Sequence, residues 1–212
     1  MVVLPVFVQA PWVHIHPNSA LLFTVVIASL GFFLAEKIGE RWTNIGSLLI
    51  GVSGSWFGGC LFWGWLRSQP VWHLPVESIV LPLAVIGLYS KWRLGSSFYL
   101  ASLLGTAFTD LMIVCTGVME SWPQVVQASF SDAPEILSNT AYMLLKPQSI
   151  ALILFAGLLI LWISLWMKRR AMSTSPIGNA WLVASAALIT TLWVDGLFFL
   201  TTLIQPQLSG LI

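Results

Sequence analysis

Asp110 and Asp195 carry the strongest chemical signal in the sequence, because each interrupts a long apolar stretch. A carboxylate near the middle of a bilayer costs roughly 2.5–3.5 kcal/mol on insertion scales, so such residues usually face a protein interior and have a function. A threonine precedes each aspartate by four residues, Thr106 and Thr191, which in a helix places the two side chains on one face. Another threonine follows each aspartate, at positions 116 and 201.

The two aspartates and the threonines four residues before them predict an intramembrane polar site, made of Asp110, Asp195, Thr106 and Thr191. Counted from the expected helix ends Met119 and Ile204, both aspartates lie nine residues in, so they are expected at the same depth in helices that run in the same direction. Neighbouring carboxylates could share a proton or bind a cation. Alternatively, each aspartate could be neutral or bonded to a threonine and join two helices.

A second polar group, Arg67, His73 and Glu77, lies in one turn between two apolar stretches. His73 and Glu77 are four residues apart, and Pro75 between them leaves open whether both are helical. A glutamate at the start of a helix is stabilised by the helix dipole, so Glu77 could be structural. The alternative is a polar site at the outer mouth of a helical bundle.

Small residues recur every four positions just before this turn, at Ser47, Gly51, Ser55 and Gly59. Such a stripe lets two helices approach closely, which is the main way in which helices associate in lipid. The missing side chains could instead leave room for a flat ligand such as a quinone or a tetrapyrrole. The sequence itself requires no cofactor.

Other reactive residues give weaker signals. His14 and His16 form a His-x-His pair without an evident third ligand, and no metal motif is present, so no metal is predicted. Cys60 and Cys115 are expected as small buried side chains, with a disulfide between them left open. No nucleophile–base pair or phosphate-binding loop is legible, so an enzyme is the least supported function.

The composition predicts that these residues are held by membrane helices. Charged residues make up 8% of the chain and hydrophobic residues 58%, whereas a soluble domain has about 25% charged residues. Apolar blocks reach the roughly 20 residues that a helix needs to cross a bilayer. The net charge of +1 argues against a nucleic-acid partner, which requires clustered lysine and arginine.

The predicted fold is an all-α membrane protein with a bundle of six transmembrane helices in a single domain. An apolar segment at 1–13 with two prolines is a short or interfacial piece or a seventh span, and Pro82 should kink the third helix. In the connection 120–147, Asp132 is expected to cap an amphipathic helix, which lies in the outer interface or covers the bundle mouth. The predicted spans are 21–35, 44–66, 75–89, 96–119, 148–167 and 179–204.

The basic residues predict the orientation, since they concentrate in cytoplasmic loops. Alternation of the six spans puts the loops 36–41, 91–93 and 168–170 on one side, with the C-terminus on the opposite side. Seven of the nine lysines and arginines then lie on that side, and only Arg67 and Lys146 lie on the other. The three basic loops are therefore predicted to be cytoplasmic.

Three distinctive segments, rich in Trp, Pro and charge, carry a family resemblance: WGWLRSQPVWHLPVESIVLP, FYLASLLGTAFTD and PVFVQAPWV. Through them most of the chain resembles an uncharacterised family of cyanobacterial multi-pass membrane proteins. The resemblance implies a setting, a thylakoid or plasma membrane in which pigments, quinones and large complexes are neighbours, and no activity.

Three functions follow from the sequence, of which the third is a membrane protein that binds a quinone or a tetrapyrrole. The first is a non-enzymatic accessory or assembly factor for a photosynthetic or other membrane complex, with subunits of that complex as partners. The second is a small transporter or proton-coupled carrier that uses Asp110 and Asp195. If the two aspartates line one shared, water-accessible cavity, the carrier is favoured. If they point into separate, dry contacts in which threonines bond them, the accessory factor is favoured.

Overall fold

The computed structural model describes residues 5–37, 39–129, 131–172 and 177–208, and in these ranges the chain is helical without strands. Its π and 3₁₀ turns are Pro5–Gln9, Phe62–Leu66, Pro70–Trp72, Ser78–Val80, Val118–Glu120 and Pro206–Leu208. Its α-helices are α1 (Ala10–Ile15), α2 (Pro17–Lys37), α3 (Glu40–Leu61), α4 (His73–Glu77), α5 (Leu81–Gly87), α6 (Arg93–Cys115), α7 (Trp122–Gln127), α8 (Ala133–Met143), α9 (Pro147–Met172) and α10 (Gly178–Ile204).

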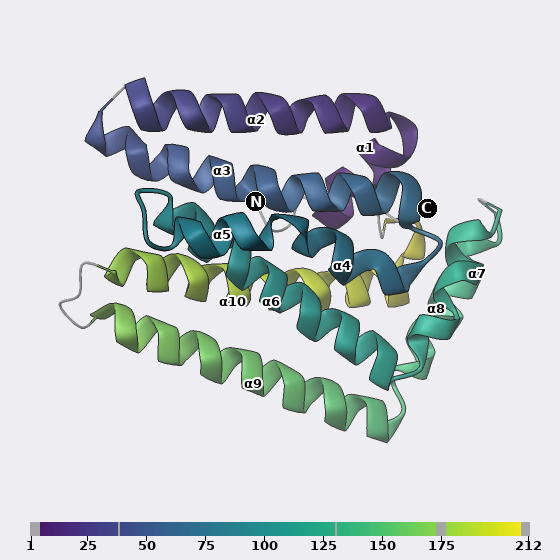
Figure 1. The fold of residues 1–212 in the computed structure, drawn as a ribbon. Coiled ribbons are helices and arrows are strands. Elements are labelled where there is room, and N and C mark those ends of the chain that lie inside the picture. The colour runs from purple at the N-terminus through teal and green to yellow at the C-terminus, as the bar shows by residue number, and fades with distance from the viewer. Residues whose placement is uncertain (1–4, 38, 130, 173–176, 209–212) are drawn as a thin grey trace.

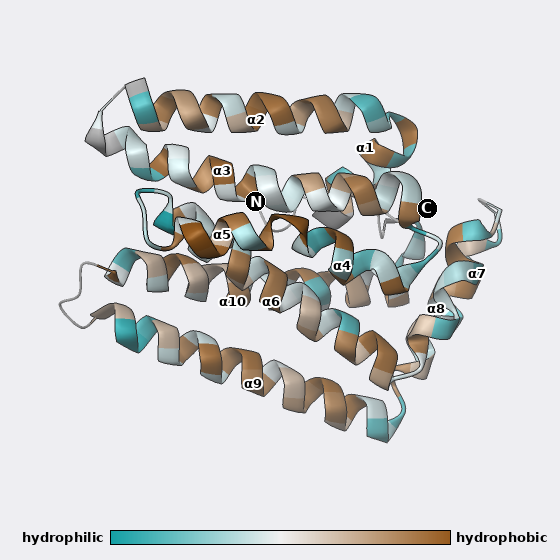
Figure 2. Ribbon diagram, viewed as in Figure 1, coloured by the Kyte–Doolittle hydropathy of each residue, from teal (hydrophilic) through white to brown (hydrophobic). Residues whose placement is uncertain are grey.

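Among the residues that the structure describes, six helical segments are long and apolar enough to cross a membrane, as the sequence predicts. Figure 2 shows their hydrophobic residues along the helix lengths, with hydrophilic residues gathered toward the ends of α2 and α9. These six apolar segments indicate a membrane-embedded protein. They are Pro17–Glu36, Trp42–Leu66, Pro70–Gly87, Arg93–Cys115, Pro147–Met172 and Gly178–Ile204.

The long helices pack in the order α2, α3, α6, α10 and α9, with α4 against α3 and α6 and α5 against α6 (Figure 1). The described residues of the connections that contain the three basic loops lie together at one end, here called the basic end. There Lys91 donates a hydrogen bond to the Glu36 carboxylate and so joins two of these connections. The opposite end carries α1, α7 and α8 and is called the α8 end. Which compartment each end faces stays a prediction.

Close contacts between glycines hold the basic end together. Gly46 lies against the backbone of Gly31 where α3 crosses α2, and Gly51 lies against the backbone of Gly95 where α3 meets α6. The Ser47 hydroxyl accepts a hydrogen bond of 2.9 Å from the Gly95 amide. A side chain at these glycines would collide with backbone atoms, so the small residues set the helix spacing.

The third span is interrupted, and this interruption decides where its polar side chains lie. It consists of α4, a 3₁₀ turn at Ser78–Val80 and α5, with Pro82 in the first turn of α5. Pro82 lacks the N–H that a continuous helix would need there, so the break lies where the sequence predicts a kink. The span begins at Pro70, five residues before the predicted start, which makes His73 part of it.

The segments at the α8 end cover the bundle mouth. α8 packs against α10 and buries Ala133, Leu137, Thr140 and Ala141, so the amphipathic helix covers the mouth. Asp132 is the residue that precedes α8, but the structure gives it no side-chain capping bond, which corrects that detail of the prediction. Its carboxylate instead accepts a hydrogen bond from Ser131.

The N-terminal segment from Pro5 to Ile15 is short and irregular, and the first span begins only at Pro17. Gln9 fixes it to α3, because its buried amide donates to the Trp56 carbonyl oxygen at 2.6 Å. Residues 1–4 of the predicted apolar segment lie outside the described residues.

Candidate functional site

Both polar groups predicted from the sequence contribute side chains to one cavity of about 150 Å³, here called the polar cavity. From α6 and α10 it is lined by Asp110, Asp195, Thr106 and Thr191, and from α4 by His73 and Glu77. Ser55, from the small-residue stripe, lines it as well. Its apolar wall is Phe62, Trp63, Pro70, Ile113, Met119, Trp122, Val194 and Phe198, and Ser102 and Thr109 complete it.

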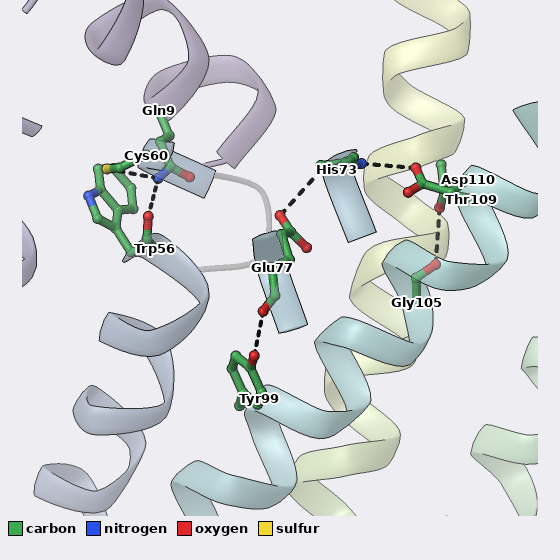
Figure 3. Close-up of polar contacts among 9 residues, drawn as sticks. All are labelled: Gln9, Trp56, Cys60, His73, Glu77, Tyr99, Gly105, Thr109 and Asp110. Carbon is green, nitrogen blue, oxygen red and sulfur yellow. Dashed lines mark hydrogen bonds and ion pairs between the residues drawn. The ribbon is translucent and has the colours of Figure 1, made fainter. Parts of the chain in front are cut away.

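His73 is held between two carboxylates in what we call the His73 triad (Figure 3). Its Nδ1 lies 2.9 Å from Oδ1 of Asp110, and its Nε2 lies 3.4 Å from Oε1 of Glu77. All three side chains are largely shielded from solvent, with exposures of 21%, 15% and 14% for His73, Asp110 and Glu77. At these exposures the charges are little screened, so the pairing matters more than on a surface.

The geometry of the triad favours a fixed number of protons. A neutral imidazole donates from one nitrogen only, and an ionised carboxylate only accepts. Both contacts are satisfied when an imidazolium lies between two carboxylates, or when a neutral imidazole accepts from one protonated carboxyl group. Each arrangement holds two protons, and loss of either proton leaves a ring nitrogen lone pair facing a carboxylate.

Asp195 has a different partner, which is compatible with two protonation states. The Thr109 hydroxyl lies 2.5 Å from Oδ2 of Asp195 and 3.2 Å from the Gly105 carbonyl oxygen of its own helix. When Asp195 is ionised, Thr109 donates to it. When Asp195 is protonated, it can donate to the Thr109 oxygen while the threonine hydrogen turns to Gly105. Asp195 therefore keeps a hydrogen bond whether or not it carries a proton.

Local backbone irregularities place the triad. The turn Phe62–Leu66 at the end of α3 is π-helical, a form that is frequent at functional sites, and it buries both Phe62 and Trp63. The Phe62 ring packs against the His73 ring with centroids 4.3 Å apart. Gly58 leaves room for the Glu77 backbone, and the Tyr99 hydroxyl donates to the Glu77 carbonyl oxygen (Figure 3). These contacts fix α4 against α3 and α6.

Arg67 is not among the residues that line the polar cavity. Its carbonyl oxygen accepts a 2.8 Å hydrogen bond from the Trp122 indole, which joins the end of α3 to α7. Burial lowers the pKa of Arg67. Burial, together with the charge of Arg67, also lowers the pKa of His14. The prediction that Arg67 shares a site with His73 and Glu77 is therefore wrong for the cavity, which His73 and Glu77 line without it.

The remaining predicted residues have structural surroundings. Gly59 lies against the Gln9 side chain. Cys60 is buried as expected, whereas Cys115 is exposed, so the expectation of a buried side chain is wrong for Cys115; both are free thiols. The Thr191 hydroxyl donates to the Ala187 carbonyl oxygen within its own helix.

Sequence reasoning missed Thr109, Trp122, Tyr99 and Gln9. Thr109 directly precedes Asp110, and neighbouring helical residues point about 100° apart. Asp110 therefore reaches α4 while Thr109 reaches α10. The available signal was Trp122 and Gln9, whose polar groups need partners once they lie in an apolar environment.

The arrangement limits the chemistry of the cavity. Among the described residues, no group of three or more His, Cys, Asp or Glu side chains could hold a metal ion. Both ring nitrogens of His73 face carboxylates, so neither is placed to activate the serines of the cavity as nucleophiles. The residues can hold, release and pass protons, and they present negative charge to a ligand.

The comparisons with known proteins give the family without a function. The sequence model of a family described as "Protein of unknown function (DUF3120)" matches residues 1–203, and the chain belongs to this family. No curated protein and no solved structure matches the chain.

Proposed function

We propose that this member of the DUF3120 family is a proton-coupled membrane carrier whose proton-binding site is the polar cavity. The observation that carries the proposal is that Asp110 and Asp195, from two parallel apolar helices, line one cavity together with His73 and Glu77. Carboxylates at this depth are costly, and in transporters they mark ion and proton pathways. Separate, dry, threonine-bonded contacts would have favoured a purely structural role. A threonine does bond Asp195, but Asp195 lines the same cavity as Asp110.

Within the site we assign different roles to its two parts. The His73 triad is satisfied by two protons and resists a change in that number. Asp195 is the group whose proton is exchanged, because Thr109 can bond its ionised and its neutral form. α4 is the element suited to move, since it is a short piece of an interrupted helix, and interrupted helices are typical of transport sites.

Solute-driven proton movement tests the proposal. The purified protein is placed in liposomes with an imposed pH gradient of either polarity, and a trapped pH-sensitive dye follows its decay. One solute of each charge class is added: (4-phenylbutyl)trimethylammonium, glycine, glucose and lactate. We expect at least one to accelerate the decay.

Two variants make the test specific. Asp195→Asn should abolish the solute-driven decay, because it removes the group whose proton is exchanged. Asp110→Asn should reduce the decay at least tenfold, because it removes a carboxylate that holds His73 in the cavity. Glu36→Gln, at the basic end, is the matched control and should leave it unchanged. If none of the four solutes moves protons faster than in protein-free liposomes, the proposal is overturned.

A second candidate is the accessory or assembly factor, in a thylakoid or plasma membrane of a cyanobacterial cell. It is favoured by Trp193, which is 69% exposed although it lies inside α10 rather than at a helix end. An indole in that place suits contact with another membrane subunit. Native pull-down from solubilised membranes tests this candidate, and migration of the protein as a free monomer without partner or pigment contradicts it.

A further inference from the structure

A second cavity of about 260 Å³ adjoins the polar cavity and is here called the apolar cavity. It is enclosed by α6, α9 and α10 and covered by residues of α7 and α8. The two cavities share five lining residues: Thr109, Ile113, Trp122, Asp195 and Phe198. Asp195 thus lies where one cavity meets the other.

The lining of the apolar cavity leaves a single group to recognise a polar ligand. Three of its threonines, Thr116, Thr140 and Thr202, donate their hydroxyl hydrogens to carbonyl oxygens of their own helices. Of the described residues that line it, Asp195 is the one with an ionisable side chain. Thr109 bonds Oδ2 of Asp195, and the described residues offer Oδ1 no hydrogen-bond donor.

Charge decides what kind of ligand this site suits. The polar cavity contains three carboxylates and one imidazole, so it keeps an excess of negative charge even with His73 protonated. A proton or an organic cation offsets that charge, and a neutral ligand does not. A quinone is disfavoured because its carbonyl oxygens are acceptors facing another acceptor.

We propose that the apolar cavity binds a lipophilic organic cation, with an aromatic or branched hydrocarbon body in the cavity and a protonated nitrogen against Asp195. Cavities of about 150 Å³ bind benzene, so 260 Å³ holds a phenyl ring with a short alkyl chain. The cation and the proton compete for Asp195, which makes the two exchange. This substrate class rests on the proposed function and names its solute.

Two glycines give a way to fill the cavity without disturbing the fold. A side chain added at Gly196 meets no atom within 4 Å, and one at Gly157 meets only Leu192, at 3.7 Å. Both glycines line the apolar cavity. Gly196→Leu should therefore occupy the ligand's space. Ala186→Leu, at an exposed position of the same helix outside both cavities, is the matched control.

Binding of 4-phenylbutylamine, measured by isothermal titration calorimetry in nanodiscs, tests the proposal, with 4-phenylbutanol as the neutral analogue. We expect the amine to bind at least tenfold more tightly than the alcohol, and less tightly as the pH falls. Asp195→Asn should reduce the affinity for the amine to that for the alcohol. This variant keeps an oxygen that can accept from Thr109. Gly196→Leu should weaken binding of both compounds, and Ala186→Leu of neither.

Equal affinity for amine and alcohol, or amine binding that survives both Asp195→Asn and Gly196→Leu, overturns the assignment. Binding is measured without a pH gradient, so it is independent of transport. If the amine binds at Asp195 but no solute drives proton movement, the proposed cation site stands and the proposed carrier function is overturned. If only glycine, glucose or lactate drives proton movement, the carrier function stands and the cation site is overturned.

Discussion

The basic end and the α8 end of the bundle use small residues in opposite ways. At the basic end, Gly51 and Gly95 bring two helices into backbone contact and leave no space between them. At the α8 end, Gly196 faces open space in the apolar cavity. Helix α3 contributes small residues to both ends: Ser47 forms a hydrogen bond with α6, whereas Ser55 lines the polar cavity. The closed end fixes the helices, and the hollow end holds the ionisable groups that could do chemistry.

The largest effect should come from an added methyl group at the closed end. In Gly95→Ala the new Cβ would collide with the Ser47 carbonyl oxygen and the Gly51 amide, which are backbone atoms that cannot turn away. We expect a loss of about 3 kcal/mol in the free energy of unfolding. Gly196→Ala adds a methyl group that meets no atom within 4 Å, so it should not lower this free energy and should raise it by up to about 1 kcal/mol, because alanine favours a helix more than glycine does. Unfolding in mixed micelles of rising SDS content, followed by tryptophan fluorescence, measures both; equal losses would refute the contrast.

The closed end was largely predictable from the sequence, and the hollow end only in part. Apolar runs of about 20 residues must be helical in a bilayer, because every backbone polar group needs an internal partner there. The spacing of Ser47 and Gly51 likewise indicates a face for close packing. The same spacing continues to Ser55, however, and nothing in it tells a packed face from the wall of a cavity.

The site was predictable as residues but not as a constellation. Asp110 and Asp195 stand out because charge is costly in an apolar helix. Their union with His73 depends on the break at Ser78–Val80 and on the π turn at Phe62–Leu66. These irregularities rotate α4 toward α6. Such local departures from the α-helix arise from tertiary packing, which hydropathy and residue spacing do not record.

Thr109 tests whether the hydrogen-bond switch at the hollow end supports proton exchange. Thr109→Val keeps the shape of the side chain and removes the hydroxyl that bonds Asp195. Hydrogen bonds to charged groups contribute about 1.5–3 kcal/mol, so we expect solute-driven proton flux in liposomes to fall at least tenfold. Thr190→Val is the control, since that hydroxyl donates to the Ala186 carbonyl oxygen within α10 and the residue is not among those that line either cavity. Flux that is the same in both variants would exclude the switch.

Tyr99 lies at the border between the two ends, and its removal should loosen only the hollow one. Tyr99→Phe deletes the hydrogen bond to the Glu77 carbonyl oxygen, which is worth about 1 kcal/mol. We expect faster amide hydrogen exchange in α4 and the turn that follows it, with exchange in α2 unchanged. Faster exchange throughout the bundle would mean that the ends are not independent.

Arg67 gives the smallest effect and defines the edge of the hollow region. Burial and the Arg67 charge both lower the pKa of His14, so Arg67→Gln should raise that pKa while burial keeps it below the ordinary value of about 6.5. A lowered histidine pKa means that the unfolded chain binds more protons between the two pKa values, so His14 favours folding above about pH 6.5 and loses this contribution as the pH falls. The substitution should weaken this dependence of stability on pH.

Because Trp122 bonds only the Arg67 backbone, α7 should stay in place in Arg67→Gln and solute-driven proton flux should not change. NMR titration of the histidine rings measures the first effect; a tenfold loss of flux would instead place Arg67 in the site.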